Sequence, residues 1–167
     1  MTQVITSEMI KEAEEKGACP EAIKWLKQSP RTVASLKRYH PEWALWAVGN
    51  LPTLANEHLS NEQVWTLAQK DPWRGLEFVS DRLSNEQVWT LAQKDPWGGL
   101  FHVRDRLSDE QVWDLAQLAP GAGLAYAKDR LSDEQVWDLA QKNPWAGLKF
   151  VSDRLSDEQV AILRKKG

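Results

Sequence analysis

The chain has 167 residues, of which 42% are hydrophobic and 27% are charged, a balance that is typical of folded proteins and excludes a disordered chain. Its formal net charge of −3 gives no general reason to expect nucleic acid or an anionic membrane as a partner. Cys19 is the one cysteine, so an internal disulfide is excluded and a reducing, cytoplasmic environment is expected.

The first 58 residues are predicted to form a divergent helical cap, with helices over about residues 7–16 and 20–28. The opening MTQVITSEMIKEAEEKG lacks the apolar run of a signal peptide. No stretch of the chain approaches the roughly 18 apolar residues of a membrane span. We therefore expect a cytoplasmic protein that does not bind a membrane.

A degenerate repeat is predicted over residues 29–51. The segment SPRTVASLKRYHPEWALWAV aligns with the first regular repeat at an offset of 31 residues, so that Ser29 corresponds to Ser60 and Leu45 to Leu76. Terminal units of helical arrays are often atypical because one of their faces meets water, and we interpret this segment in that way.

From Leu59 onward, the sequence repeats with a period of 24 residues and without a gap. The first two copies agree at 20 of 24 positions, and the third copy is the most divergent. The four copies and the half copy that follows them span 59–82, 83–106, 107–130, 131–154 and 155–167.

Each copy is predicted to form two short helices. Ser60 and Gln63 have the spacing of a capping box, which marks the start of the first helix. Asp71-Pro72 starts the second helix, because proline is tolerated in the first turn of a helix and restricts the residue before it. One side of each helix is apolar: Val64, Trp65, Leu67 and Ala68 in the first, and Leu76, Val79 and Leu83 in the second.

Helices of roughly nine residues are too short to be stable alone, so each must bury its apolar side on its neighbours. The predicted fold is therefore all-α, an α-solenoid of antiparallel helix pairs in which each pair contacts the next. We expect one continuous domain, with residues 1–58 as its N-terminal cap and 155–167 as its C-terminal capping helix.

The pattern SDEQVWDLAQKNPWAGLKFVSDRL resembles the short αα repeats of a family of unknown function that is found in bacterial, viral and effector-type proteins. The resemblance covers about two thirds of the chain, and the two tryptophans depart from the smaller residues usual in that family. GACPEAIKWL, at 17–26, is similar to a short helical opening of bacterial and phage repeat proteins. The resemblance implies a microbial helical-repeat protein and carries no activity or catalytic residue.

Differences between the copies single out a candidate surface on the second helix. The variable positions are those of residues 74, 77, 78 and 80, and a helical wheel places 74 and 77 opposite the apolar side. We interpret them as an exposed ridge that binds a protein partner, the alternative being a solvent face that drifts freely. The candidate partner-binding residues are Arg74, Glu77, Phe78, Phe101, His102, Arg104, Tyr126, Lys128, Lys149 and Phe150.

Two invariant features have structural interpretations. Gly75 and its equivalents predict a close approach between helices, with a tryptophan ring lying over the glycine. Asp81-Arg82 is interpreted as an inter-repeat cap and ion pair, in which the arginine reaches a residue of the Glu62 type in a neighbouring repeat.

The paired tryptophans, Trp65 and Trp73 in the first copy, are interpreted as core residues and not as an exposed stacking surface. In the third copy the second tryptophan is replaced by Gly121. We expect Leu118 to fill part of the space of the missing ring.

A search for chemistry finds no catalytic arrangement. The three histidines occupy unrelated repeat positions without metal-ligand spacing. No nucleophile elbow or phosphate-binding loop is present. Cys19 is expected to be a buried, inert side chain. We predict no enzymatic activity, no cofactor and no metal.

The prediction is a scaffold that binds a protein, as a monomer or weak homo-oligomer. One alternative is that exposed tryptophans stack on sugars or bases. Another is nucleic-acid binding by a basic patch, although the acidic repeats disfavour it. A self-associating structural array and a designed repeat protein are further alternatives. The basic patch consists of Lys24, Lys27, Arg31, Lys37 and Arg38.

Overall fold

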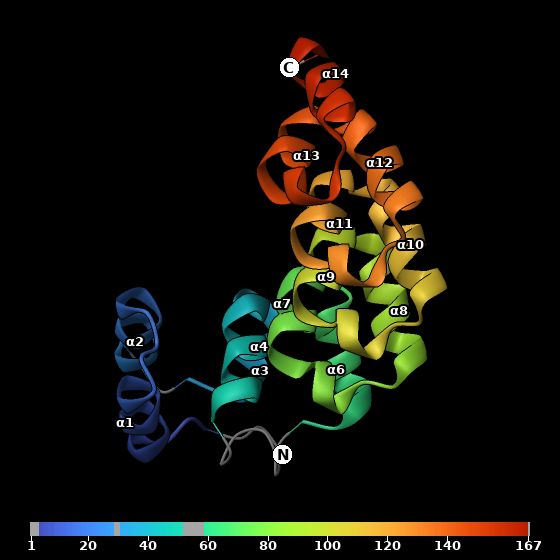
Figure 1. Cartoon of the computed structure of the whole chain (residues 1–167). Coiled ribbons are helices and arrows are strands. Elements are labelled where there is room, and N and C mark those ends of the chain that lie inside the picture. Colours follow the sequence, from blue (N-terminus) through green and yellow to red (C-terminus); the bar gives the residue numbers. More distant parts are fainter. Residues whose placement is uncertain (1–3, 29–30, 52–58, 167) are drawn as a thin grey trace. The chain divides into compact units, whose positions relative to one another are not determined.

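The structure is a computed structural model of the whole chain, and it describes residues 4–28, 31–51 and 59–166. Within these ranges every regular element is a helix (Figure 1). Consecutive helix pairs contact each other, so the predicted all-α repeat fold of solenoid type is confirmed. The chain divides into two compact units, unit 1 (residues 1–87) and unit 2 (residues 88–167). That all repeats form one continuous domain stays a prediction.

Unit 1 begins with helices α1 (Ser7–Glu15) and α2 (Pro20–Lys27), which agree with the two predicted helices to within one residue at each end. The hydroxyl of Thr6 caps α1 by accepting a hydrogen bond from the Met9 backbone N–H at 3.3 Å. The chain turns between the helices at Gly17, whose φ of 79° lies in the left-handed region that favours glycine.

The degenerate repeat forms the helix pair α3 (Val33–Tyr39) and α4 (Pro41–Asn50). The predicted cap, Ser29, lies outside the described residues. The cap of α3 is Thr32, which exchanges two hydrogen bonds with Ser35, each of 3.1 Å. Leu45 is 0% exposed, in agreement with its alignment on the buried Leu76.

The first regular repeat forms α6 (Asn61–Ala68), α7 (Pro72–Val79) and the 3-10 turn η1 (Ser80–Arg82). Ser60 and Gln63 form the predicted capping box through two hydrogen bonds of 3.3 Å. Asp71 caps the second helix by accepting from the Arg74 backbone N–H at 3.1 Å. The second helix is shorter than predicted, because the chain tightens into the 3-10 turn directly after Val79.

Unit 2 repeats this arrangement. The boundary between the units falls inside the first helix of the second copy, α8 (Asn85–Lys94). Within unit 2 the helices α10 and α12 lie on one side of the stack, and α9, α11 and α13 lie on the other (Figure 1). Its later elements are α9 (Pro96–His102), η2 (Arg104–Arg106), α10 (Asp109–Leu118), α11 (Pro120–Tyr126), η3 (Lys128–Arg130), α12 (Asp133–Lys142), α13 (Pro144–Phe150), η4 (Ser152–Arg154) and α14 (Asp157–Lys166).

The predicted close approach at the repeated glycine is confirmed, but its partner is an alanine and not a tryptophan. A Cβ atom built on Gly123 would lie 2.6 Å from the Cβ of Ala116 in the first helix of the same repeat. It would also lie 3.1 Å from the Leu139 side chain of the next repeat. Gly75, Gly99 and Gly147 face the corresponding alanines in the same way.

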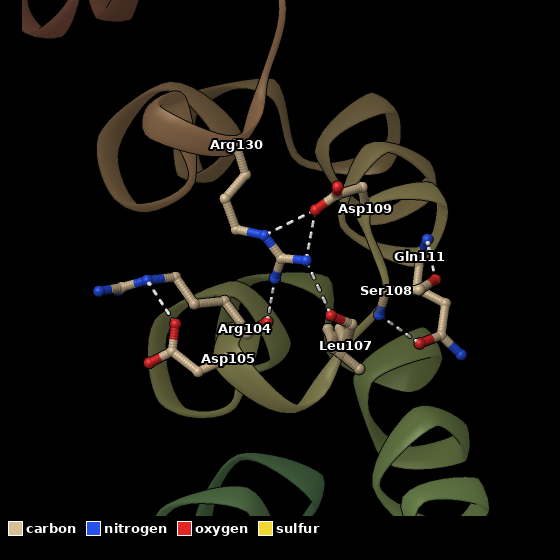
Figure 2. Close-up of polar contacts among 7 residues, drawn as sticks. All are labelled: Arg104, Asp105, Leu107, Ser108, Asp109, Gln111 and Arg130. Carbon is tan, nitrogen blue, oxygen red and sulfur yellow. Dashed lines mark hydrogen bonds and ion pairs between the residues drawn. The ribbon is translucent and has the colours of Figure 1, made fainter.

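The arginine of the repeated Asp-Arg pair fixes the start of a first helix (Figure 2). The Arg130 guanidinium donates to Asp109 at 2.9 Å and to the backbone carbonyls of Arg104 and Leu107. Arg154 binds Asp133 and two carbonyls in the same manner. An ion pair is therefore present in the last two copies, but it joins two residues of the same copy and not of neighbouring copies, and its acid is the residue before the Glu62-type position. That acid is the first residue of its helix, directly after the serine cap. The link to the preceding copy is the hydrogen bond from the arginine to a backbone carbonyl, that of Arg104 for Arg130.

Candidate protein-interaction surface

The predicted ridge is only partly exposed. At the position of residue 77, Glu77, Phe101 and Lys149 are exposed. At the position of residue 78 all four side chains are half-buried, including those of His102 and Tyr126. Both positions therefore contribute to the surface of the second helices, the first more strongly than the second.

The position of residue 74 does not belong to this surface in unit 2. Arg74 is exposed in unit 1, where it pairs with Asp71 at 3.3 Å, but Gly98, Ala122 and Ala146 are buried. The reason is that a second helix such as α11 is covered from two sides, since it contacts both α9 and α13. The small size of Gly98, Ala122 and Ala146 is a sequence feature that indicates this burial, and a helical wheel does not take it into account.

The second tryptophan series is at the surface, which corrects the prediction that it lies in the core. Trp97 is 46% exposed and Trp145 is 63% exposed, whereas Trp73 is half-buried. The replacement by Gly121 therefore leaves no cavity to fill, and Leu118 is itself 68% exposed. The first series, represented in unit 2 by Trp89, Trp113 and Trp137, is half-buried, so each of its rings contributes in part to the packed interior.

Aromatic side chains from three consecutive second helices form two clusters, which together we call the aromatic surface. Trp97 and Phe101 of α9 each meet Tyr126 of α11 edge to face, with ring centroids 5.3 Å and 4.8 Å apart. Farther along unit 2, Trp145 and Phe150 of α13 also meet edge to face, at 5.9 Å. The aromatic surface consists of these five residues.

Three cationic side chains lie on the same helices or just after them. The Lys149 ammonium lies 4.5 Å from the ring centroid of Trp145 and 5.0 Å from that of Phe150. Lys128 donates a hydrogen bond to the Phe150 carbonyl at 2.8 Å, so this candidate residue also joins one repeat to the next. Arg104 pairs with the neighbouring Asp105 at 3.7 Å. Of the three, Lys149 is the one whose charge belongs to the aromatic surface.

Unit 1 uses part of its basic patch internally. Lys27 forms an ion pair with Glu14, and the Arg31 guanidinium lies 4.4 Å from the ring centroid of Trp25. Lys37 and Arg38 line a shallow groove together with Lys70.

The prediction that Cys19 is buried is wrong, because its side chain is exposed at the start of α2. It lines a cleft of unit 1 that also includes Trp43, Trp46 and Arg74. Its place as the residue before Pro20, outside the helix, explains why it does not pack with the apolar side of α2. Within the described ranges, no group of three His, Cys, Asp or Glu side chains is arranged to hold a metal ion.

Comparison with protein-family models, with curated proteins and with solved structures finds no match for this chain. None of the described helices combines the length and the apolar character that crossing a bilayer requires.

Proposed function

We propose that this protein is a non-enzymatic scaffold that binds another protein through the aromatic surface of unit 2. The observation that carries the proposal is the exposure of Trp97, Phe101 and Trp145, three large rings that the repeat leaves outside its core. Exposed aromatic side chains that gather on one face are typical of binding sites, in which a few such rings supply most of the affinity.

The geometry of the rings favours a protein over a stacked sugar or base. Bases stack on open ring faces, and a platform for several of them needs a row of such faces. Here Trp97 and Phe101 lean against Tyr126 at interplanar angles of 75° and 74°, which makes one compact apolar surface. Such a surface suits the apolar side chains of a folded partner or of a docked helix.

The exposure of Trp145 also supports the stacking alternative, because its ring has only Phe150 and Lys149 as its aromatic and cationic neighbours among the described residues. Titration with oligosaccharides and with single-stranded oligonucleotides tests this second candidate. A change in tryptophan emission that is lost in Trp145→Ala would favour it over a protein partner.

The double variant Phe101→Ala/Trp145→Ala tests the main proposal. Both rings are exposed, so the fold should survive while partner affinity falls by about tenfold or more, since truncation of an interface anchor costs about 1–2 kcal/mol. A photo-crosslinking residue at position 101, used in a lysate of the source cells, identifies the partner. Binding of the purified partner to each variant is then measured by calorimetry, and thermal unfolding is followed by circular dichroism.

Leu118→Ala is the matched control, because Leu118 is an exposed apolar side chain of the same unit that lies on a first helix. It should leave affinity unchanged. Equal loss of affinity in the control, or unchanged affinity in a folded double variant, would refute the proposal. Light scattering of the purified chain distinguishes a self-associating array.

A further inference from the structure

A second surface of unit 2 has a different chemistry from the aromatic surface. A groove lies between the first helices α10 and α12. These two helices are on the opposite side of the stack from α9, α11 and α13 (Figure 1). The residues that line it are Trp113, Glu134, Gln135, Trp137, Asp138 and Gln141. Two tryptophan rings and two carboxylates therefore share one groove.

The two tryptophans of the groove are half-buried, so each ring packs partly on the interior and presents the rest to the groove. The face of an indole ring carries negative electrostatic potential and attracts a cation, arginine more often than lysine. Among the described residues, no lysine or arginine lies over Trp113 or Trp137, in contrast to Lys149 over Trp145.

The charge of the groove is negative. Helices α10 and α12 carry six carboxylates and one lysine, whereas the net charge of the whole chain is only −3. Two of the six, Asp109 and Asp133, are bound by Arg130 and Arg154. Asp138 pairs with Lys142 at 2.8 Å, and Glu134 is exposed at the groove without an ion pair among the described residues.

The same residue types recur one repeat earlier, which makes an extended ligand more suitable than a single small cation. Trp89 is half-buried like Trp113, and α10 supplies Glu110, Asp114 and Gln117 at the positions of Glu134, Asp138 and Gln141. A chain that carries several cations is able to follow these positions along the first helices, gaining affinity at each of them.

We propose that this face of unit 2 binds an arginine-rich segment of another polypeptide. The guanidinium groups stack on Trp113 and Trp137 and pair with Glu134 and Asp138. Arginine suits both contacts, because its planar group stacks on aromatic rings and donates a fork of hydrogen bonds to a carboxylate. Phosphate-bearing partners are disfavoured by the same carboxylates. The inference does not depend on the aromatic surface.

Fluorescence anisotropy with a labelled peptide of repeated Arg-Ser-Gly units tests the proposal on the full chain. The peptide should bind at low salt, its lysine version more weakly, and its glutamine version not at all. Glu134→Gln/Asp138→Asn should weaken binding of the arginine peptide by about tenfold, the effect of losing one or two charge-assisted hydrogen bonds.

Asp129→Asn/Asp153→Asn is the control, because it removes the same charge from exposed 3-10 turns of the same unit. It should change affinity by less than about twofold, since these exposed charges are largely screened. Equal weakening in both double variants would overturn the proposal, because it would show general attraction to an acidic protein.

Nuclear magnetic resonance of the indole N–H groups locates the peptide without removing any charge. The signals of Trp113 and Trp137 are identified from Trp113→Phe and Trp137→Phe, which keep an aromatic ring in the packed position. Both signals should shift on addition of the arginine peptide, while those of Trp97 and Trp145 should not. Shifts confined to Trp97 and Trp145 would place the peptide on the aromatic surface and overturn the proposal.

Discussion

At the scale of single residues, the glycine of each second helix decides how closely the two helices of a repeat approach. Glycine inside a helix costs about 1 kcal/mol relative to alanine, so its recurrence needs a compensating contact. The contact is the alanine of the first helix, whose Cβ would lie 2.6 Å from a Cβ at Gly123. A separation below 3 Å to an atom fixed on the backbone forces the two helices apart.

Gly123→Ala is therefore expected to destabilise the chain although alanine is the better helix former. The overpacking cost of about 1–3 kcal/mol exceeds the gain of about 1 kcal/mol in helix propensity. The free energy of unfolding in urea should fall by up to about 2 kcal/mol. Adding Ala116→Gly should restore part of the loss, because the two positions share one contact.

Gly121→Ala is the control for this prediction, since it makes the same change in the same helix. A Cβ at Gly121 would meet only the Nδ2 atom at the end of the Asn143 side chain, at 3.0 Å, so a shift of a few tenths of an ångström relieves the contact. Such a small shift leaves the hydrogen bond from Ala146 to the Asn143 Oδ1 atom in place. Stability should stay the same or rise slightly. Two equal effects at 121 and 123 would contradict the role assigned to the alanine contact.

At the scale of elements, the N-terminal caps of the second helices are an internal comparison. Asp95 accepts a hydrogen bond from the Gly98 backbone N–H at 2.9 Å, and Asn143 accepts one from Ala146 at 3.0 Å. Ala119 begins α11 with nearly the same backbone angles as Asp95, φ −131° and ψ 71° against φ −133° and ψ 82°, but without a side-chain acceptor. Helix α11 therefore starts without the side-chain hydrogen bond that caps α9 and α13.

Ala119→Asp is expected to raise the free energy of unfolding by about 1 kcal/mol, because the carboxylate gains a cap without a change of the backbone. The reverse change, Asp95→Ala, should lower it by a similar amount. Urea unfolding measures both. A destabilised Ala119→Asp variant would show that α11 is held by its neighbours in a geometry that the cap does not reach.

Helix starts were predictable from the sequence, whereas the exposed faces of the second helices were not. Ser60 with Gln63, and Asp71 before Pro72, act within one helical turn, so their spacing alone determines the geometry. The exposure of Trp97 and the burial of Ala122 depend on how each second helix is covered by the next. A helical wheel separates an apolar side from a polar side. In the stack, however, the second helices of the preceding and following repeats also cover a second helix such as α11, so only part of its polar side stays exposed. The aromatic surface could therefore be predicted only in part.

At the scale of the whole molecule, equivalent residues are covered unequally toward the C-terminal end of unit 2. Leu124 and Val136 are 0% exposed, but their equivalents Leu148 and Val160 are only half-buried. A further helix pair placed at this end would cover them, because each pair in the repeat buries the apolar side of the pair before it.

Helix α14 carries a large side chain at the position where stacking of such a pair requires a small one. It carries Arg164 where α12 has Ala140, which is 0% exposed and lies 2.7 Å from a Cβ atom built on Gly147. An arginine at this position occupies the space into which the glycine of a following second helix would pack. The place of an added repeat therefore decides whether it folds onto the array.

One additional copy of residues 131–154, inserted between Arg154 and Leu155 of the full chain, is expected to stabilise it. Both junctions then reproduce contacts already present between repeats, so helicity should rise and the urea dependence of unfolding should increase by roughly a seventh, in proportion to chain length. The same copy appended after Lys166 should add neither helicity nor stability unless Arg164→Ala is also introduced. Helicity is measured by circular dichroism and stability by urea unfolding, for the chain with the inserted copy and for the chains with the appended copy with and without Arg164→Ala. Equal stabilisation by the appended copy with Arg164 in place would show that the arginine does not block further stacking.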